Sequence, residues 1–363
     1  MKNIFIVIIA MLLMASCSSK SDRSSFAGTT TISVDEPTKK VRYEFVKRIP
    51  LKLEGEDVIG SIGKIIYMDN RFYVHDRRQN LIWQFDKDGT LKNKLAAIGS
   101  GPGEYVAIQT FDVTDEGLLY VLDSHGRKVN AYDVDNFDFK FSIPTKNLIL
   151  DLGVANKENL FAERCIVQSG NHIKLGKFGK EDPELKAIMK YDHNGEDQLT
   201  RVNPFRFYRS GNDLIYYNRF SDAIYSLDGD SLKQVLTVKS SRLPNNEQIE
   251  NLISKKLRRN ESNEESKISH IEKNDVVLDI SNIYFTPSYI YMSLQTYPLT
   301  HLFIDRKTNE VATLAFGDNS TENFKRCIVG ALGTCEDYFI TRQAPENEDD
   351  DYALILFKMQ PVD

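Results

Sequence analysis

One β-rich unit occurs twice near the start of the chain, and the spacing of its copies constrains the fold more than any other feature. Three pairs of landmark residues share an offset of 47 positions: Tyr73 and Tyr120, Asp76 and Asp123, and Phe85 and Tyr132. Each copy holds two short apolar runs, and each run ends in Asp. A fixed period in the forties, carried by short strands and polar turns, is typical of propeller blades. The sequence therefore predicts a repeated β-sheet module.

More divergent copies follow at similar spacing. They lie at 160–162 with 188–195, 214–217 with 223–229, 290–294 with 301–305, and 338–341 with 353–357. In the third copy we predict an inserted polar loop from Ser169 to Pro183. Six units over roughly 320 residues leave about 50 residues each, which suits a propeller with insertions. We therefore expect an all-β, six-bladed β-propeller with four-stranded antiparallel blades.

The strand pattern supports this class. The run Leu118–Leu122 is apolar at every position, which indicates a sheet buried on both faces. The segment Tyr43–Leu53 is predicted to be a strand that pairs with the last blade, because closing the ring removes open sheet edges. One surface helix is expected after Pro244, where Asn245 and Gln248 have capping-box spacing. The apolar residues that follow recur on one helical face.

The first residues are typical of an export signal. Lys2 is followed by an apolar stretch, Ile4–Met14, that is too short to span a bilayer. The sequence Met14-Ala15-Ser16-Cys17 resembles the lipobox of bacterial lipoproteins, which implies lipidation of Cys17; a plain secretory signal is the alternative. Several acyl chains at about 0.8 kcal/mol per buried CH₂ would hold the protein at a membrane.

Three regions follow from these observations. We expect a lipoprotein signal peptide at 1–16, a flexible tether at 17–40 and the propeller at 41–363. The predicted location is the cell envelope, anchored through Cys17, with the outer membrane favoured and the periplasmic or surface side left open. Net charge is −6 with no sustained basic stripe, so nucleic acid is not an expected partner.

The stretch from Ile98 to Asp133 resembles a diverged NHL repeat. Its family positions are held by Gly103-Glu104-Tyr105, Phe111-Asp112-Val113, Tyr120–Asp123 and Tyr132-Asp133. The repeat's usual Arg before the third strand is Lys128 here, which weakens any transfer of NHL binding roles. Together with the lipobox, the chain resembles the 6-bladed β-propeller lipoproteins of Gram-negative anaerobes over about Tyr43–Met359. That resemblance implies fold and location more than chemistry.

The glycine-rich run 99–105 is predicted to be a tight crossover between neighbouring blades. Gly99, Gly101 and Gly103 tolerate positive φ, Pro102 fixes its own φ, and Glu104 can cap nearby backbone amides. The alternative, a phosphate-binding loop, lacks the Lys-Ser/Thr of a P-loop.

Five residues in equivalent turns are the candidate ligand-binding residues. They are Arg77, Arg78, His125, Arg127 and Lys128. Equivalent turns of successive blades project from one end of a propeller, so these side chains are predicted to line a basic mouth for an anionic or sugar ligand. A solvated loop edge is the alternative.

Other candidate chemistry is sparse. Asp76 and Asp123 recur with the repeat, which indicates turn capping rather than catalysis. The six His residues have no metal-site spacing, and no Cys-x-x-Cys pair is present. Cys327 and Cys335 flank a possible hairpin, whereas Cys165 stands apart; any pairing among the three stays open. The acidic run Glu346–Asp351 is a possible Ca²⁺ site, with a solvated hairpin tip as the alternative. No cofactor or other metal is expected.

We therefore expect a non-catalytic envelope lipoprotein that binds or scaffolds a protein or glycan partner. The alternative is a propeller enzyme (a lyase, hydrolase or dehydrogenase) with a site in the central channel, because fold alone does not decide chemistry.

Overall fold

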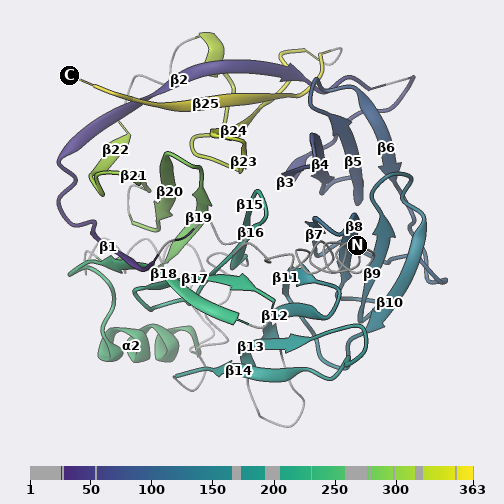
Figure 1. Cartoon of the computed structure of the whole chain (residues 1–363), viewed down its shortest axis with the longest axis horizontal. Coiled ribbons are helices and arrows are strands. Elements are labelled where there is room, and N and C mark those ends of the chain that lie inside the picture. Colours follow the sequence, from purple (N-terminus) through teal and green to yellow (C-terminus); the bar gives the residue numbers. More distant parts are fainter. Residues whose placement is uncertain are drawn as a thin grey trace, which may run out of the picture.

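The computed structural model describes most of the chain beyond the predicted signal. The described residues are 26, 28–53, 55–165, 173–192, 205–229, 231–257, 276–277, 279–296, 299–314, 322–347 and 350–362. Within them lie strands β1 to β25, helix α2 (Asn246–Leu257) and a short 3-10 helix, η3 (Glu322–Phe324). The strands form sheets around a central axis (Figure 1). The expected all-β class with a propeller-like arrangement and one inserted helix is confirmed. The predicted signal peptide 1–16 and Cys17 lie outside the described residues.

Three sheets are four-stranded antiparallel meanders in sequence order. The first holds β3 (Ile62–Met68), β4 (Arg71–Asp76), β5 (Leu81–Asp86) and β6 (Leu91–Leu95). The second holds β7 (Thr110–Thr114), β8 (Leu118–Asp123), β9 (Lys128–Asp133) and β10 (Phe139–Pro144). The third holds β11 (Asp151–Asn156), β12 (Asn159–Cys165), β13 (Ile173–Phe178) and β14 (Lys186–Lys190). The 47-residue period is therefore the step from the first sheet to the second.

The third sheet corrects one sequence expectation. Strand β13 lies inside the stretch Ser169–Pro183 that was predicted to be an inserted polar loop. It pairs with β12 from Leu160–Phe178 to Cys165–Ile173. The run Ile-Lys-Leu-Gly-Lys-Phe has no regular apolar alternation, because Gly176 and two Lys residues interrupt its three apolar residues, and the pattern therefore carries no clear strand signal here.

The fourth sheet holds β15 (Phe207–Ser210), β16 (Asp213–Tyr217), β17 (Ala223–Asp228) and β18 (Ser231–Lys239), with β1 (Thr30–Ser33) as a fifth strand. Strand β1 runs parallel to β18, with Thr30 opposite Leu236. This part of the predicted tether 17–40 is thus a sheet strand. Its Ile32 is buried, which supplies the stabilisation that a flexible linker lacks.

The fifth sheet has eight strands. Their order is β19 (Ile280–Phe285), β20 (Tyr289–Leu294), β21 (Thr300–Asp305), β22 (Val311–Leu314), β2 (Lys39–Pro50), β25 (Ala353–Pro361), β24 (Tyr338–Gln343) and β23 (Gly333–Cys335). Strand β2 pairs antiparallel with β25 from Val41–Pro361 to Pro50–Ala353. This confirms that the N-terminal strand pairs with the last strands of the chain. Strand β2 also pairs in parallel with β22, which links the two halves of the sheet.

The innermost strands contact one another in series around the axis. Strand β3 contacts β7, β7 contacts β11, β11 contacts β15, β15 contacts β19, β19 contacts β23, and β23 returns to β3. Residues of both parities are buried in strands such as β8, where all positions after Leu118 are buried. The sheets therefore pack face to face, as the uninterrupted apolar runs predicted.

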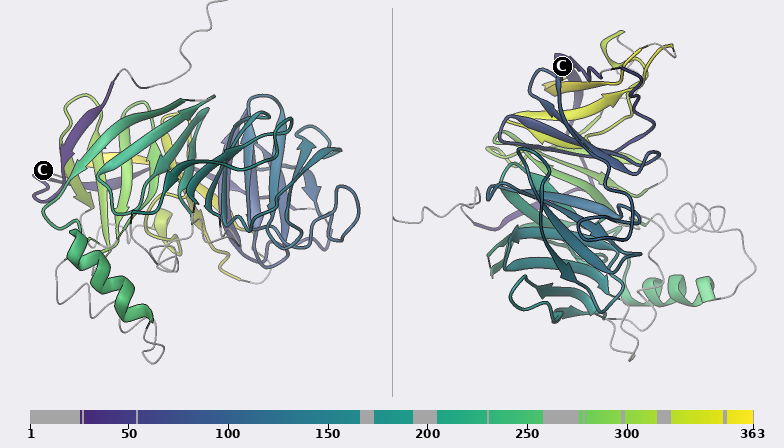
Figure 2. Two further views of the ribbon diagram at one scale, coloured as in Figure 1. Left: turned by 90° about the horizontal axis from the view of Figure 1, so that it is seen from below. Right: turned by 90° about the vertical axis from the view of Figure 1, so that its right-hand side faces the viewer.

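The ring has two ends, which differ in their connections. The turn end carries the tight turns that join the first strand of a sheet to the second and the third to the fourth, such as Asp69–Asn70 and Asp86–Gly89. The loop end carries the turns between second and third strands, such as 77–80 and 124–127, and the crossovers between sheets, such as 96–109. Figure 2 shows α2 projecting from one face of the ring.

Helix α2 belongs to the crossover between β18 and β19, at the loop end. Its first turn has the predicted capping box: the Asn245 N–H donates to Gln248 Oε1 (2.9 Å) and the Gln248 N–H donates to Asn245 Oδ1 (2.9 Å). Ile249 and Ile253 are buried on one face, as their spacing predicts.

Candidate functional site

The two turns that carry the predicted basic residues are shaped by the recurring aspartates. Asp76 is fully buried, and its carboxylate accepts N–H groups from Gly60 (2.6 Å), Ser61 (3.1 Å), Arg78 (3.0 Å) and Gln79 (3.1 Å). One side chain thus ties its own turn to the crossover that precedes the same sheet. The capping role predicted for Asp76 is confirmed.

Asp123 repeats this arrangement in the next sheet. Its carboxylate accepts N–H groups from Val106 (2.9 Å), Ala107 (3.4 Å) and Gly126 (2.8 Å). Gly126 leaves room for this carboxylate, since an added Cβ would lie 2.2 Å from Asp123 Oδ2. Asp123 is therefore also a turn cap.

The two turns are joined to each other through the crossover residues 105–108. Asn80 Nδ2 donates to the Val106 carbonyl (3.1 Å), and Asn80 Oδ1 accepts the Ile108 N–H (2.7 Å). The buried Tyr105 donates from its hydroxyl to the Leu95 carbonyl (3.0 Å) and lies 3.1 Å from the Asn80 carbonyl. Turn 77–80, crossover 105–108 and turn 124–127 therefore form one continuous, hydrogen-bonded surface at the loop end.

The glycine-rich run stabilises the same crossover. Glu104 Oε2 accepts the Gly101 N–H (2.7 Å), as its capping role predicts. Gly103 has φ +74°, and a Cβ there would lie 2.7 Å from the Phe139 ring. The run connects β6 to β7, which confirms its prediction as a crossover between neighbouring sheets.

All five predicted binding residues lie on this surface. Arg77, Arg78, His125 and Arg127 are exposed, and Lys128 is half-buried with Nζ 3.4 Å from the Gly101 carbonyl. Arg127 takes a positive φ of 52° and donates from Nη1 to the Lys146 carbonyl (3.3 Å). The fold thus brings the basic side chains of two neighbouring sheets to one end; their contact with a ligand stays a prediction.

The apolar part of this surface was not predicted from the sequence. Val58 and Val106 are 63% and 47% exposed, and both belong to crossovers that contact the basic turns. The Val58 carbonyl accepts a hydrogen bond from Gln79 Nε2, and Val106 is bonded to Asn80. We call these residues with the five predicted ones the loop-end patch: Val58, Arg77, Arg78, Val106, His125, Arg127 and Lys128. In the sequence, the signal for Val58 and Val106 is an apolar residue inside a crossover that is otherwise rich in glycine and acidic residues.

A second candidate region lies along the central axis, where buried charges meet. Arg209 on β15 donates to Asp112 on β7 from Nε (3.0 Å) and from Nη2 (2.6 Å). Asp112 Oδ2 also accepts the Val154 N–H of β11 (2.8 Å). Both side chains are almost completely buried. This bidentate pair therefore joins three sheets.

Asp151 and Lys64 repeat the same pattern with perturbed acidity. Asp151 is fully buried and accepts the N–H groups of Arg206 (2.6 Å) and Phe207 (3.1 Å). Burial raises the pKa of Asp151 to about 6, against the opposing effect of Lys64. Burial also lowers the pKa of Lys64, whose Nζ donates to the Phe111 carbonyl of the neighbouring sheet (2.7 Å). Both groups bond to the backbone of an adjacent innermost strand.

A further ion cluster lies nearer the loop end of the axis. Arg206 binds Asp279 in a bidentate pair, Nη1–Oδ1 2.7 Å and Nη2–Oδ2 2.8 Å, with both side chains fully buried. Arg219 Nη2 lies 3.6 Å from Asp279 Oδ2, and Glu163 Oε1 lies 4.0 Å from Arg206 Nε. Burial and the neighbouring Arg206 lower the pKa of Arg219. The cluster connects the third, fourth and fifth sheets.

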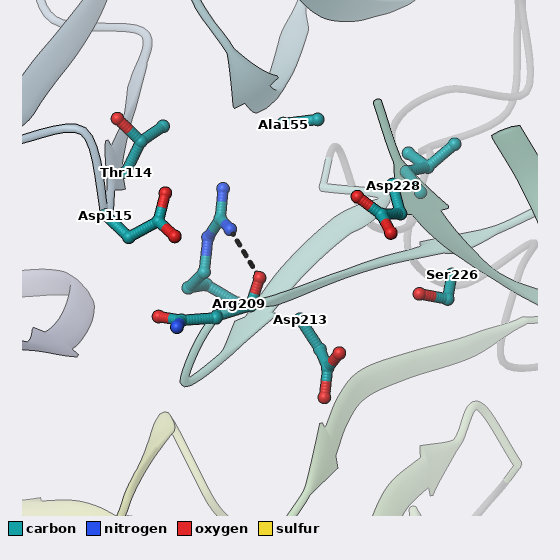
Figure 3. A pocket seen from close by; sticks show the side chains of 9 residues that line it. Thr114, Asp115, Ala155, Arg209, Asp213, Ser226 and Asp228 are labelled. Carbon is teal, nitrogen blue, oxygen red and sulfur yellow. Dashed lines mark hydrogen bonds between the residues drawn. The ribbon is translucent and has the colours of Figure 1, made fainter. Parts of the chain in front are cut away.

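A small pocket opens at the turn end (Figure 3). Arg209 lies at its centre and donates from Nη1 to the Asn212 carbonyl (3.2 Å). Asp115, Asp213 and Asp228 lie around it, so three of the four charged residues in the lining are acidic. This pocket is at the opposite end from the loop-end patch, and it includes none of the predicted binding residues.

The remaining candidates are placed as follows. Cys327 and Cys335 are free thiols, so the hairpin disulfide is not present, and burial raises the pKa of each thiol to about 11. The Cys165 side chain and His172, His193 and His270 lie outside the described residues. Of the acidic run, residues 348 and 349 also lie outside them, and a Ca²⁺ ion there stays a prediction.

No three His, Cys, Asp or Glu side chains among the described residues are grouped as a metal ion would require. No helix in the part of the chain that the structure describes has the length and apolar character needed to cross a membrane.

A family model described as "Domain of unknown function (DUF4934)" matches residues 29–351. No curated protein is significantly similar in sequence.

Solved structures resemble the chain at low sequence identity. A "Putative exported protein" from Bacteroides fragilis NCTC 9343 has a TM-score of 0.68 at 13% identity, covering 92% of this chain and 99% of that one. A member of the DUF4221 family from Bacteroides vulgatus ATCC 8482 has a TM-score of 0.54 at 11% identity, covering 89% and 99%. These similarities show a shared fold alone.

Proposed function

This chain belongs to the DUF4934 family, and we propose that it is a six-bladed propeller lipoprotein of the cell envelope that binds a partner without catalysis. In this proposal the partner is a protein or glycan that carries negative charge. It binds at the loop-end patch, and the chain is anchored through lipidated Cys17.

Six blades follow if the eight-stranded sheet is counted as two. Strands β19 to β22 form one sequential meander, and β23, β24, β25 and β2 form a second four-stranded group. The pairing of β2 with β22 is limited to Lys39–Val41, so it bridges the two groups only at one corner. The closed series of contacts among the innermost strands supports this count.

The envelope location is supported by the sequence Met14-Ala15-Ser16-Cys17 and by the similarity to a protein described as exported. If Cys17 is lipidated, cells fed a labelled fatty acid incorporate it into the wild type but not into Cys17→Ser. The substituted protein is then released from the membrane fraction. Incorporation that persists in Cys17→Ser would contradict the lipoprotein proposal.

The observation that carries the binding role is the composition of the loop-end patch. Exposed basic side chains from two adjacent sheets lie beside exposed Val58 and Val106 on a backbone fixed by Asp76 and Asp123. A rigid surface loses little conformational entropy on binding, and a mixture of Arg and apolar side chains is common at protein interfaces.

Binding is tested with arrayed anionic glycans and with acidic peptides as probes. We expect Arg78→Ala/Arg127→Ala to weaken binding at least tenfold, because two charged contacts of about 1 kcal/mol each are lost. Lys87→Ala/Lys157→Ala at the turn end is the matched control and should bind like the wild type. Unchanged binding of every probe by the Arg78→Ala/Arg127→Ala variant would contradict the proposal.

The non-catalytic reading is preferred over the enzyme alternative for a specific reason. Perturbed pKa values such as those of Lys64 and Asp151 are frequent at active sites. Here, however, each of these groups bonds to the backbone of the next sheet, as does Asp112. Their positions are accounted for by the joining of one blade to the next.

A further inference from the structure

We propose that the protein stands on the membrane with its turn end toward the lipid headgroups and its loop-end patch toward the aqueous side. The inference rests on the proposed lipidation of Cys17, and it specifies which face of the ring a lipid anchor can reach. It follows from where the N-terminal chain is held.

The first described residue is fixed at the turn end. Phe26 is 8% exposed, and its ring meets Phe285 edge-on at a centroid distance of 4.9 Å. The guanidinium of Arg306 lies 5.4 Å from the same ring. Phe285 ends β19 and Arg306 follows β21, so both belong to the turn end. Lys233 Nζ also donates to the Phe26 carbonyl (3.1 Å).

The chain then runs from the turn end toward the loop end. Thr29 Oγ1 donates to the Gln234 carbonyl (2.7 Å), and β1 continues along β18 from Leu236 to Lys239. Asp35 accepts the Ser241 N–H (2.7 Å) beyond the end of β18. The contacts from Phe26 to Asp35 therefore hold this segment along β18 from the turn end to the loop end.

The covalent distance from the anchor is short. Phe26 lies nine positions after Cys17, and this stretch of chain reaches at most about 30 Å when fully extended. From Lys233 to the loop end of β18 is a further six residues, roughly 20 Å, and α2 projects beyond that point. A fully extended tether would need most of its length to reach the loop end, and α2, which projects beyond that end, would keep the loop end from contacting the bilayer.

The loop-end patch is also on the far side of the ring. Phe26 is held beside β18 and β19, whereas the patch belongs to the sheets that begin with β3 and β7. Along the ring of innermost strands, β3 and β15 are separated by β7 and β11 on one side; on the other side β15 contacts both β19 and β23, and β23 contacts β3. The patch is therefore remote from the anchor both along the axis and across the ring.

The surface at the turn end suits contact with headgroups rather than insertion. Its turns carry charged side chains, including Asp88, Asp135 and Asp182, which are largely exposed. Such side chains remain hydrated and do not enter the acyl region. Each of these carboxylates is paired with a Lys or Arg side chain, whereas an anionic bilayer would attract the exposed Arg77 and Arg78 of the loop end. Electrostatic attraction to anionic lipid therefore opposes the orientation that covalent reach favours. Vesicle composition therefore makes a stringent test.

The experiment measures the height of each end above a bilayer. The protein beginning at Cys17, with Cys165 and Cys327 replaced by Ser, is coupled through Cys17 to a maleimide lipid in phosphatidylcholine vesicles. The thiol of Cys335 is buried and its pKa is raised to about 11, so Cys17 reacts preferentially. A fluorophore is attached through an azidophenylalanine at Asp88 or Lys157, or at Arg78 or His125, and energy transfer to a lipid-surface acceptor is recorded.

We expect at least about twofold greater transfer from Asp88 and Lys157 than from Arg78 and His125, since roughly 20 Å of strand separates the ends. Inserting about 30 Gly and Ser residues before Phe26 should abolish the difference, because that linker alone reaches roughly 30 Å on average. Equal or reversed transfer in the uninserted protein would overturn the orientation. Reversal upon adding phosphatidylglycerol would also overturn it and would show that the patch binds lipid. Because the coupling is chemical, the result is independent of whether cells lipidate Cys17.

Discussion

Removing the buried carboxylate of Asp112 is the most informative single perturbation of this fold. In Asp112→Asn the shape is kept, but Arg209 loses its charged partner while its side chain stays 5% exposed. Asp112 Oδ2 accepts hydrogen bonds from Arg209 Nη2 (2.6 Å) and from the Val154 N–H (2.8 Å), and the Asn side chain replaces this carboxylate with a neutral amide. Breaking a buried ion pair from one side costs about 3–5 kcal/mol, because a charge is left uncompensated in a poorly solvated site.

The corresponding change in melting temperature can be worked from the size of the domain. At about 2.1 cal/mol/K per residue, a folded unit of roughly 320 residues has an unfolding entropy near 0.7 kcal/mol/K. A loss of 3–5 kcal/mol therefore lowers Tm by about 4–7 °C, measured by circular dichroism at pH 7. The matched control is Asp88→Asn, whose pair with Lys47 is about half-exposed, and it should change Tm by about 1 °C or less.

A double substitution separates the ion pair from general damage. If Asp112 and Arg209 act as a pair, Asp112→Leu/Arg209→Met should be less destabilised than the sum of the single variants by at least about 2 kcal/mol. A loss below about 1 kcal/mol in Asp112→Asn, or strict additivity in the double variant, would refute the view that this pair holds the sheets together.

Three further predictions concern pH, the glycine-rich crossover and the turn caps. Burial lowers the pKa of His75 to about 4 and raises that of Asp151 to about 6. The contribution of His75 to the free energy of unfolding is present above its unfolded-state pKa near 6.5 and is lost as pH falls toward 4. The contribution of Asp151 has the opposite sign: it is present below about pH 4 and is lost as pH rises through 6. Each is worth up to about 3 kcal/mol. Burial also lowers the pKa of His301, so His75→Phe should lose less stability than the wild type between pH 7 and pH 4.5 in urea unfolding, and an equal loss would contradict this. In the same assay, Gly103→Ala should lower the free energy of unfolding by about 1–3 kcal/mol, because φ is +74° and the new Cβ would contact Phe139. The control Gly211→Ala, which has a positive φ but open space around it, should lower it less. Asp123→Ala should cost at least about 2 kcal/mol and speed amide exchange at Val106 and Gly126; unchanged exchange would show that the carboxylate does not hold this surface.

The sequence predicted the local parts of this structure well. The repeat at 47 residues, the strands on either side of Asp76 and Asp123, the crossover at 99–105 and the cap of α2 depend on residues close together in the chain. A turn cap or a strand pattern is encoded within a few positions, so it can be read without knowing the rest of the fold. Pairing of the first strand with the last also followed, since an open sheet edge is unfavourable.

The sequence was less informative where a segment depends on distant partners. The sequence predicts a tether where strand β1 lies, because four residues with one large apolar side chain carry no strand signal. Strand β18, about 200 residues later, supplies its partner. Strand β13 was hidden in the same way by its glycine and lysines. The basic half of the loop-end patch could be predicted from equivalent turns. Val58 was missed, because the hydrogen bond from Gln79 to its carbonyl, which places it beside those turns, forms only in the folded chain.

By itself, then, the sequence determined that a β-sheet module repeats and where its turns and caps lie, because those depend on short-range hydrogen bonding and hydrophobic periodicity. Tertiary structure alone decided how the modules are joined and which face carries which chemistry. Arg209 meets Asp112 across 97 residues, and Lys64 reaches the Phe111 carbonyl in the next sheet. Such contacts form only when the ring closes, since no property of Arg209 or Lys64 in the linear chain specifies which carboxylate or carbonyl it will reach.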